Sequence, residues 1–250
     1  MLYFFVLFSL VFLQQGTDVN GVRGRLGFLF FALVNISFAV VSPLAASLPL
    51  ERSIIRRERA AGTYRASSAF AALFFSILPT VSLGVATFSI PVYWFVGLQI
   101  QVQQYFVFLF VMYFQGIVSL AIGLAIGSYA PNPQVGAIFA PMVLVVCLLF
   151  GGLLLNLNNS TWVLRWLKYL SHIHWSYNAL AQNEFTGLLF NCIGVSGACY
   201  PTGQNVIDSY ALNDLSLWWS ELANLGLFLS WIYLGYLAFS SKSRPLSRLV

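Results

Sequence analysis

The side chains best suited to chemistry in this 250-residue sequence are its two histidines, His172 and His174. A pair of imidazoles can bind a metal ion or act as a general base. Residues two apart on a helix do not face one site, however, and no aspartate, glutamate or cysteine lies close to them in the sequence. The spacing therefore predicts neither a metal centre nor a catalytic site.

The sequence also lacks the residues that two other kinds of enzyme require. A nucleotide-binding loop of the type G-x-x-x-x-G-K-[ST] cradles phosphates, yet no glycine in this chain is followed by lysine. An intramembrane enzyme needs a nucleophile beside a base, and the apolar stretch described next offers serine and threonine without a base. We therefore expect a protein that is not an enzyme and that holds no cofactor of its own.

The longest feature of the sequence is a stretch without formal charge. None of the 99 residues from 66 to 164 is Asp, Glu, Lys, Arg or His. A soluble surface needs charge to stay solvated, whereas a charge at the centre of a bilayer costs roughly 2.5–3.5 kcal/mol on insertion scales. Charged residues make up only 8% of the chain, against about 25% in soluble domains. The net charge of +5 lies in short clusters between apolar runs, so the sequence predicts a membrane protein that does not bind nucleic acid.

The apolar segments predict an all-α membrane protein with six transmembrane helices in a single domain over 1–250. These spans cover about 2–13, 26–48, 66–98, 105–128, 135–157 and 217–240. We interpret the first as the second half of a helix whose beginning is absent from the chain. The third contains Pro79, where we expect a kink. Between the spans we expect a short charged helix at about 49–64, ended by Gly62, and a long extracellular loop at about 158–216.

The basic residues predict the orientation of these spans. Alternating crossings place 49–65, 129–134 and 241–250 on one side, with eight of the twelve lysines and arginines. Because cytoplasmic loops carry the excess of Lys and Arg, this side is expected to be cytoplasmic. The loop 158–216 then lies in an oxidising compartment, where Cys192 and Cys199 are expected to form a disulfide. Two free thiols, or pairing with a second subunit, are the alternatives.

Three groups of residues carry a resemblance to a known family. Each group is a weak motif alone, but all three occur in the family's order and together cover nearly the whole chain. The sequence is similar to the membrane domain of ABC transporters of the G subfamily, the half-transporters of the white-pigment, sterol and multidrug group. The groups are Glu51-Arg52 with Arg57-Glu58, Gly62-x-Tyr64-Arg65-x-Ser67-Ser68 and Leu78-Pro79; Gly152-Leu153-Leu154-x-Asn156-Leu157; and Asn183-Glu184-Phe185-x-Gly187-x-x-Phe190-x-Cys192 with Pro201-Thr202-Gly203.

The resemblance implies roles for the matching positions. The charged segment would be the coupling helix that contacts a nucleotide-binding domain, and Leu153 and Leu154 would form a gate at the exit of a substrate cavity. Phenylalanines spaced as on the second span more often serve packing, but an amide such as that of Asn35 prefers protein or a cavity to lipid. The coupling residues are Glu51, Arg52, Arg57 and Glu58, and the cavity residues are Phe30, Phe31, Asn35, Phe38, Val145 and Leu148.

The predicted function is that of the permease domain of an ATP-driven exporter of hydrophobic or amphipathic compounds in the plasma membrane. Its expected partners are a nucleotide-binding domain in cis or in trans, which would hold ATP and Mg, a second transporter subunit, a hydrophobic small-molecule substrate and membrane lipid. A truncated regulatory or structural partner of a full transporter, with no transport of its own, is the alternative. Export of polysaccharide, by a related class of membrane domain, is less well matched because the expected cavity is aromatic.

Overall fold

The computed structural model describes residues 2–16, 19–154, 166–190 and 201–242. Within these ranges the chain is helical, and the nearest approach to a strand is an isolated bridge between Leu189 and Thr202. The predicted all-α class is therefore confirmed. The helices are α1 (Leu2–Val11), α2 (Val19–Ala60), α3 (Ala66–Val96), α4 (Val102–Tyr129), α5 (Pro133–Leu149), the 3-10 helix η2 (Trp166–Leu170), α7 (His172–Phe185), α8 (Gly203–Ser209) and α9 (Leu217–Lys242).

Four of these helices are long and apolar enough to cross a membrane: α2 over Gly21–Arg52, α3, α4 and α9. The chain is therefore an integral membrane protein. Helix α5 has 17 residues and α1 has ten, so each is shorter than a typical span. The predicted count of six spans stays a prediction.

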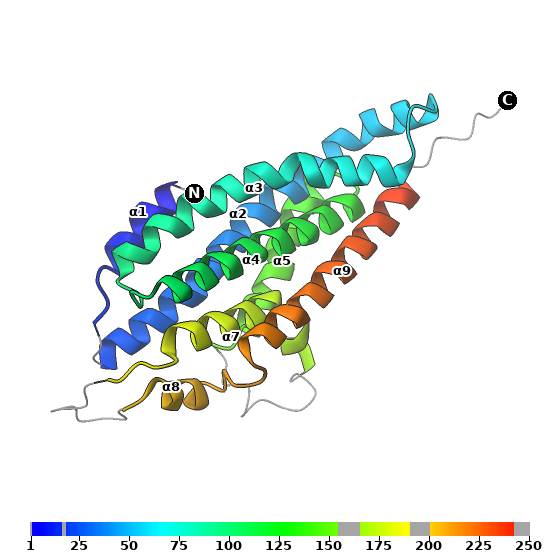
Figure 1. Ribbon diagram of the computed structural model, residues 1–250. Helices are drawn as coiled ribbons and strands as arrows, with labels where there is room; N and C mark the ends of the chain where they lie inside the picture. Colours follow the sequence, from blue (N-terminus) through cyan, green and yellow to red (C-terminus); the bar gives the residue numbers. More distant parts are fainter. Residues whose placement is uncertain (1, 17–18, 155–165, 191–200, 243–250) are drawn as a thin grey trace.

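Helix α2 is the longest element and continues past the membrane. Its 42 residues correspond to roughly 60 Å, about twice the thickness of the hydrocarbon core. The segment predicted as a separate helix at 49–64 is the last part of α2, because the helix continues through Pro43 and Pro49. Figure 1 shows this part extending beyond the bundle, beside the start of α3. Helix α3 likewise continues through Pro79 and Pro91.

Local sequence explains where several helices begin and end. The side chain of Asn132 accepts a hydrogen bond from the backbone N–H of Val135 (2.9 Å), and Pro133 occupies the first turn of α5. Gly62 follows the end of α2 with φ of +76°, in the left-handed conformation that favours glycine. The prediction that Gly62 ends this helix is confirmed. The N–H and hydroxyl of Thr63 both donate to the Glu58 carbonyl, which closes the turn.

Helix α4 lies at the centre of the bundle and packs against α2 on one side and α9 on the other (Figure 1). Small residues allow this close approach. A Cβ atom added at Gly127 would lie 2.9 Å from the Cβ of Leu48, and one at Gly123 would lie 3.0 Å from a methyl group of Leu44. On the other side, Gly235 of α9 lies directly over the backbone of Ala125. Glycines four apart on one helix face are a recurrent means of bringing membrane helices together.

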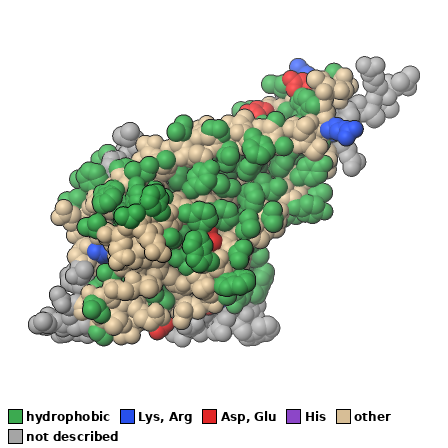
Figure 2. Space-filling model, in the orientation of Figure 1, with side chains coloured by type: hydrophobic (Ala, Val, Ile, Leu, Met, Phe, Trp, Pro, Cys, Tyr) green, Lys and Arg blue, Asp and Glu red, His purple; other side chains and the backbone are tan. Residues whose placement is uncertain are grey.

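The two ends of the bundle differ from its middle. Figure 2 shows a face covered largely by hydrophobic side chains, with lysine and arginine side chains only toward its ends. At one end, Lys242 of α9 donates to the carbonyl of Tyr129, the last residue of α4 (2.7 Å). The ends of α2, α4 and α9 therefore lie together, whereas α7 and α8 lie at the opposite end (Figure 1).

Candidate functional site

The predicted cavity residues of α2 do not share one environment. Phe30 is fully buried, and its ring packs edge-on against Tyr177 of α7 at 5.3 Å between centroids. Phe31 is 42% exposed, and Phe38 is half-buried against the core. The amide of Asn35 is buried, and its Oδ1 has no hydrogen-bond partner among the described residues. Phe30 thus lies inside this single chain and Phe31 faces out of it, and the cavity role of both stays a prediction.

The remaining predicted cavity residues lie on α5, and the predicted gate residues lie on the turn after it. Helix α5 packs against α2, with Val145 exposed and Leu148 half-buried. Beyond α5 the chain turns at Gly152, whose φ is +105°, and the half-buried Leu153 and the exposed Leu154 follow. A Cβ atom at Gly151 would lie 2.6 Å from the Phe30 ring, so this turn is seated on α2. The turn that precedes the predicted gate therefore lies against Phe30, and the gate role of Leu153 and Leu154 stays a prediction.

Arg52 connects the charged part of α2 to the end of α4. One of its guanidinium nitrogens donates to the carbonyl oxygens of Gly127 (3.1 Å), Ser128 (2.7 Å) and Ala130 (2.7 Å). The last carbonyls of a helix have no partners within it and carry partial negative charge, which a cation satisfies. Any displacement of this part of α2 would therefore act directly on α4.

The other predicted coupling residues lie nearby and are open to solvent. Glu51, Arg57 and Glu58 are all exposed. Glu58 accepts a hydrogen bond from the hydroxyl of Tyr64 (2.5 Å), and this bond raises the pKa of Tyr64 to about 12. This bond holds the turn at 61–65 against α2. Glu51, Arg57 and Glu58 stay exposed on the part of α2 that extends beyond the bundle.

The two histidines point to different partners, as their spacing predicted. His172 is completely buried and lies 3.2 Å from the hydroxyl of Ser37, and burial lowers the pKa of this histidine to about 3. His174 lies 3.1 Å from Asp214. No group of three or more potential metal ligands occurs in the part of the chain that the structure describes. No carboxylate lies near these histidines in the sequence, but the fold brings Asp214 to His174 from 40 positions away.

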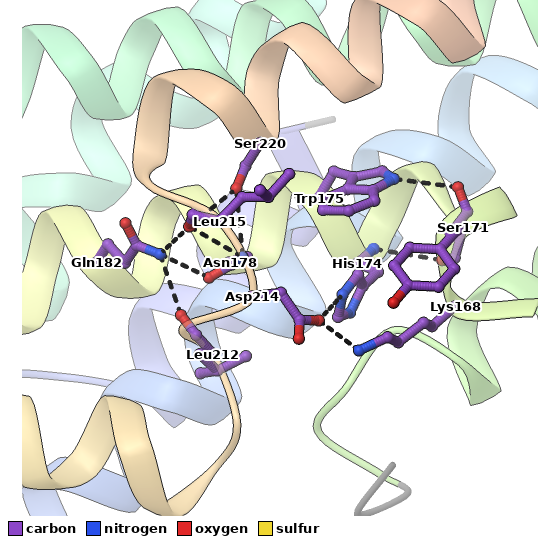
Figure 3. Close-up of polar contacts among 11 residues, drawn as sticks. Lys168, Ser171, His174, Trp175, Asn178, Gln182, Leu212, Asp214, Leu215 and Ser220 are labelled. Carbon is purple, nitrogen blue, oxygen red and sulfur yellow. Dashed lines mark hydrogen bonds and ion pairs between the residues drawn. The ribbon is translucent and has the colours of Figure 1, made fainter. Parts of the chain in front are cut away.

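Asp214 is the centre of a polar cluster that fastens the segment before α9 to α7 (Figure 3). It accepts from Lys168 of η2 at 2.6 Å as well as pairing with His174, and these bonds lower the pKa of Asp214 to about 2. Farther along α7, the Gln182 amide donates to the carbonyls of Leu212 (3.1 Å) and Leu215 (2.6 Å). Each donor in this cluster meets a specific acceptor, which is typical of contacts that stabilise a fold.

A second polar network crosses the interior and was not predicted from the sequence. Gln115 of α4 donates to Ser37 of α2 (2.8 Å) and accepts from Ser176 of α7 (2.9 Å), and Asn224 of α9 donates to Ser176 (2.9 Å). All are buried. The amide residues Gln115 and Asn224 within apolar helices were the available indication, because polar side chains in spans face the bundle interior.

The motif Asn183-Glu184-Phe185 has a structural explanation. Glu184 forms a buried ion pair with Arg25 of α2. Both of its carboxylate oxygens also accept from the backbone N–H of Gln99, at 3.2 Å each. Burial raises the pKa of Glu184 to about 7, although Arg25 opposes this. Asn183 donates to the carbonyl of Gln104 at 2.9 Å. The end of α7 thus holds together α2, α4 and the turn after α3.

Part of the prediction lies outside the described residues. Cys192 and Cys199 both fall there, so their disulfide stays a prediction. Within the described residues, Cys147 is a buried free thiol on α5.

Comparisons with known proteins give the family. A model of the ABC-2 type transporter family matches residues 1–185. The chain is 24% identical over 243 residues to ABC transporter G family member 7 of Arabidopsis thaliana, covering 96% of this chain and 33% of that protein. It is 28% identical over 249 residues to ABC transporter G family member 1 of Dictyostelium discoideum, covering 96% and 31%.

A mammalian relative is similar to the same extent. The chain is 28% identical over 241 residues to the broad substrate specificity ATP-binding cassette transporter ABCG2 of Sus scrofa, covering 91% of this chain and 36% of that protein. The chain thus spans about a third of the length of these relatives. Since the family match extends over most of the chain and these relatives are G-family members, the protein belongs to the ABC-2 type transporter family, as its resemblance to the G subfamily predicted.

Proposed function

We propose that this chain is the membrane-spanning permease domain of an ATP-driven exporter of hydrophobic or amphipathic compounds, such as lipids, sterols or xenobiotics. Membership of the ABC-2 type transporter family supports the permease role. One relative is named for broad substrate specificity, which supports a range of substrates rather than a single one. By analogy with the family, the plasma membrane is the proposed location.

The observation that carries the proposal is the outward side of α2 and α5. There Phe31 and Val145 are 42% and 45% exposed, and Asn35, one helical turn after Phe31, is buried with an amide oxygen that has no hydrogen-bond partner among the described residues. An unpaired amide in a membrane helix favours contact with protein or ligand over lipid. A second subunit packed against this side would enclose an aromatic, nearly uncharged cavity suited to apolar molecules.

The charged end of α2 provides a route from ATP hydrolysis to this cavity. In the proposed mechanism a nucleotide-binding domain, in cis or in trans, holds ATP and Mg and presses on Glu51, Arg57 and Glu58. Because Arg52 bonds to the last carbonyls of α4, movement of α2 would be transmitted to the central helix. Closing of the cavity would then force substrate past Leu153 and Leu154.

Replacement of Phe38 by alanine tests the cavity assignment. ATP-dependent uptake of a labelled sterol into inside-out membrane vesicles is expected to fall several-fold, with dimer assembly unchanged. The matched control is Phe75→Ala on α3, because Phe75 is well exposed on a lipid-facing helix. Equal transport by Phe38→Ala and the parent protein would overturn the assignment.

The size of the native polypeptide separates this function from that of a regulatory partner without transport. A blot of cell membranes with an antibody against 241–250 measures it. A band well above 27.8 kDa would support a permease joined to further domains. A band at 27.8 kDa would require a separate ATPase for transport and would favour the regulatory role.

A further inference from the structure

A groove runs along the outside of the bundle between α5 and α9, with α4 as its floor. Its volume is about 1010 Å³. Ala125 and Ile126 of α4 lie in the floor, and the walls include Val143 of α5 and Trp231 and Leu234 of α9. Both α5 and α9 pack against α4 (Figure 1). Because α4 and α9 are long and apolar enough to cross a membrane, the groove opens toward lipid.

The groove has the length of one leaflet of the bilayer. Trp231 lies 11 residues before Lys242 on α9, which corresponds to roughly 16 Å along the helix. This is about half the thickness of the hydrocarbon core. Ser240, Ser241 and Lys242 line the same groove at the end of α9. The groove therefore combines an apolar part, suited to an acyl chain, with a polar end that carries a cation.

Lys242 is held in place at this polar end. Its ammonium group donates to the carbonyl of Tyr129 at 2.7 Å and lies 4.7 Å from the centre of the Tyr129 ring. An ammonium group has three N–H donors, and the bond to Tyr129 uses one of them. Both residues are exposed, so a ligand can reach the ammonium group. An anionic headgroup would therefore meet a cation whose position is already fixed.

The charges around the groove favour an anion. The described residues that line it include no aspartate or glutamate. Arg52 of α2 donates to the carbonyl of Ala130, a lining residue, at 2.7 Å, so a second cation lies beside the polar end. The groove between α2 and α3 is lined instead by Glu51. The sequence predicts that this end is cytoplasmic, and basic pockets between membrane helices on that side bind anionic lipid headgroups.

The groove lies on the opposite side of α5 from the substrate cavity proposed above. Val145 was assigned to that cavity, and Val143 of the groove precedes it by two residues. Side chains two residues apart on a helix point roughly 200° apart. A second subunit packed against α2 and α5 would therefore leave the groove open to lipid.

We propose that this groove binds one anionic phospholipid of the cytoplasmic leaflet, with an acyl chain along Val143, Trp231 and Leu234 and the phosphate at Lys242. Binding requires neither transport nor a nucleotide-binding domain. Its failure and the failure of the permease proposal are therefore separate results.

A scintillation proximity assay tests the site by measuring binding of tritiated dioleoylphosphatidylserine to the purified chain in dodecyl maltoside micelles. We expect saturable binding of one molecule per chain. Unlabelled dioleoylphosphatidylserine should displace the probe at a concentration roughly fivefold lower than dioleoylphosphatidylcholine does. The two lipids have the same acyl chains, so the difference measures recognition of the headgroup.

Two variants test the two parts of the groove. Lys242→Gln removes the cation and is expected to weaken binding about fivefold. Its control is Arg65→Gln, because Arg65 is an exposed cation before α3 that does not line the groove. Ala238→Phe fills the groove without changing Lys242 and is expected to abolish saturable binding. Ala137→Phe adds the same ring at an exposed position of α5 outside the groove and should leave binding unchanged.

Size-exclusion chromatography checks that each variant is folded and reports its assembly. Absence of saturable binding, equal affinity for the two lipids, or parent affinity in either Lys242→Gln or Ala238→Phe would overturn the proposal. Displacement of the lipid by inorganic phosphate, at an ionic strength matched with chloride, would assign Lys242 to a free anion and would also overturn it. Loss of a dimer in Ala238→Phe alone would instead assign the groove to a second copy of the chain.

Discussion

The two buried glutamates Glu184 and Glu221 differ in whether a cation lies beside them. Glu184 at the end of α7 is 1% exposed and is surrounded by the Arg25 guanidinium and the N–H of Gln99. Glu221 at the start of α9 is 5% exposed, and no cation among the described residues forms an ion pair with it. Burial alone thus does not define the role of a charged group. The presence of a cation separates Glu184, whose ion pair joins two helices, from Glu221, which is buried without an ion pair among the described residues.

The largest effect is expected at the paired carboxylate. Glu184→Gln leaves Arg25 buried without a countercharge, so it should lower the free energy of unfolding by about 3–5 kcal/mol. Thermal unfolding of the purified chain in dodecyl maltoside measures this loss. The double variant Arg25→Met with Glu184→Leu removes both charges and should recover part of the stability. A Glu184→Gln protein as stable as the parent would contradict the structural role.

The next effect is expected in the uncharged network of α4. Gln115→Leu removes the partner of both Ser37 and Ser176 and leaves their hydroxyl groups buried. We expect a loss of about 1–3 kcal/mol, measured in the same way. Gln103→Leu is the matched control, because Gln103 is exposed at the start of the same helix. An equal change for the two variants would mean that the network contributes nothing to stability.

The cluster around Asp214 is expected to make stability depend on pH. Its pairing with His174 and Lys168 lowers the pKa of Asp214 from 3.8 to about 2, so the folded state favours the ionised form. The resulting stability, at most about 2 kcal/mol, is fully present above pH 4 and is lost as the pH falls toward 2. Unfolding midpoints of the parent chain and of Asp214→Asn, compared from pH 6 to pH 2, measure it. Parallel curves would contradict the prediction.

The smallest effect on stability is expected at the carboxylate without an ion pair among the described residues. Glu221→Gln keeps the shape of the side chain and breaks no ion pair of the described residues, so the free energy of unfolding should stay within about 0.5 kcal/mol of the parent value or rise. The same substitution at Glu184 is the direct comparison. A loss of several kcal/mol at Glu221 would show that the two regions do not differ as the structure indicates.

Much of the helical framework could be predicted from the sequence. Helices α4 (Val102–Tyr129) and α9 (Leu217–Lys242) lie within a few residues of the predicted segments 105–128 and 217–240. The physical reason is that a bilayer requires about 20 apolar residues per crossing, and this requirement is local in sequence. Proline is a less certain guide, because Pro49 was expected to precede a separate helix and lies inside α2.

The loop 158–216 was the least predictable region. The sequence predicts an extracellular loop here, yet every residue of α7 except Gln182 is buried. The burial depends on hydrogen bonds such as those from Ser176 to Gln115 and from Gln182 to Leu215. These bonds join residues that are 61 and 33 positions apart, so no local sequence pattern predicts them.

The sequence by itself determined that this is a helical membrane protein, because 99 residues without charge can be stable only in lipid, and its motifs determined the family. Only the tertiary structure decided which buried polar side chains have a hydrogen-bond or ion-pair partner. Glu184 and Glu221 are the same residue type beside apolar segments. They differ because Arg25, 159 positions from Glu184, forms an ion pair with it, whereas no cation among the described residues pairs with Glu221.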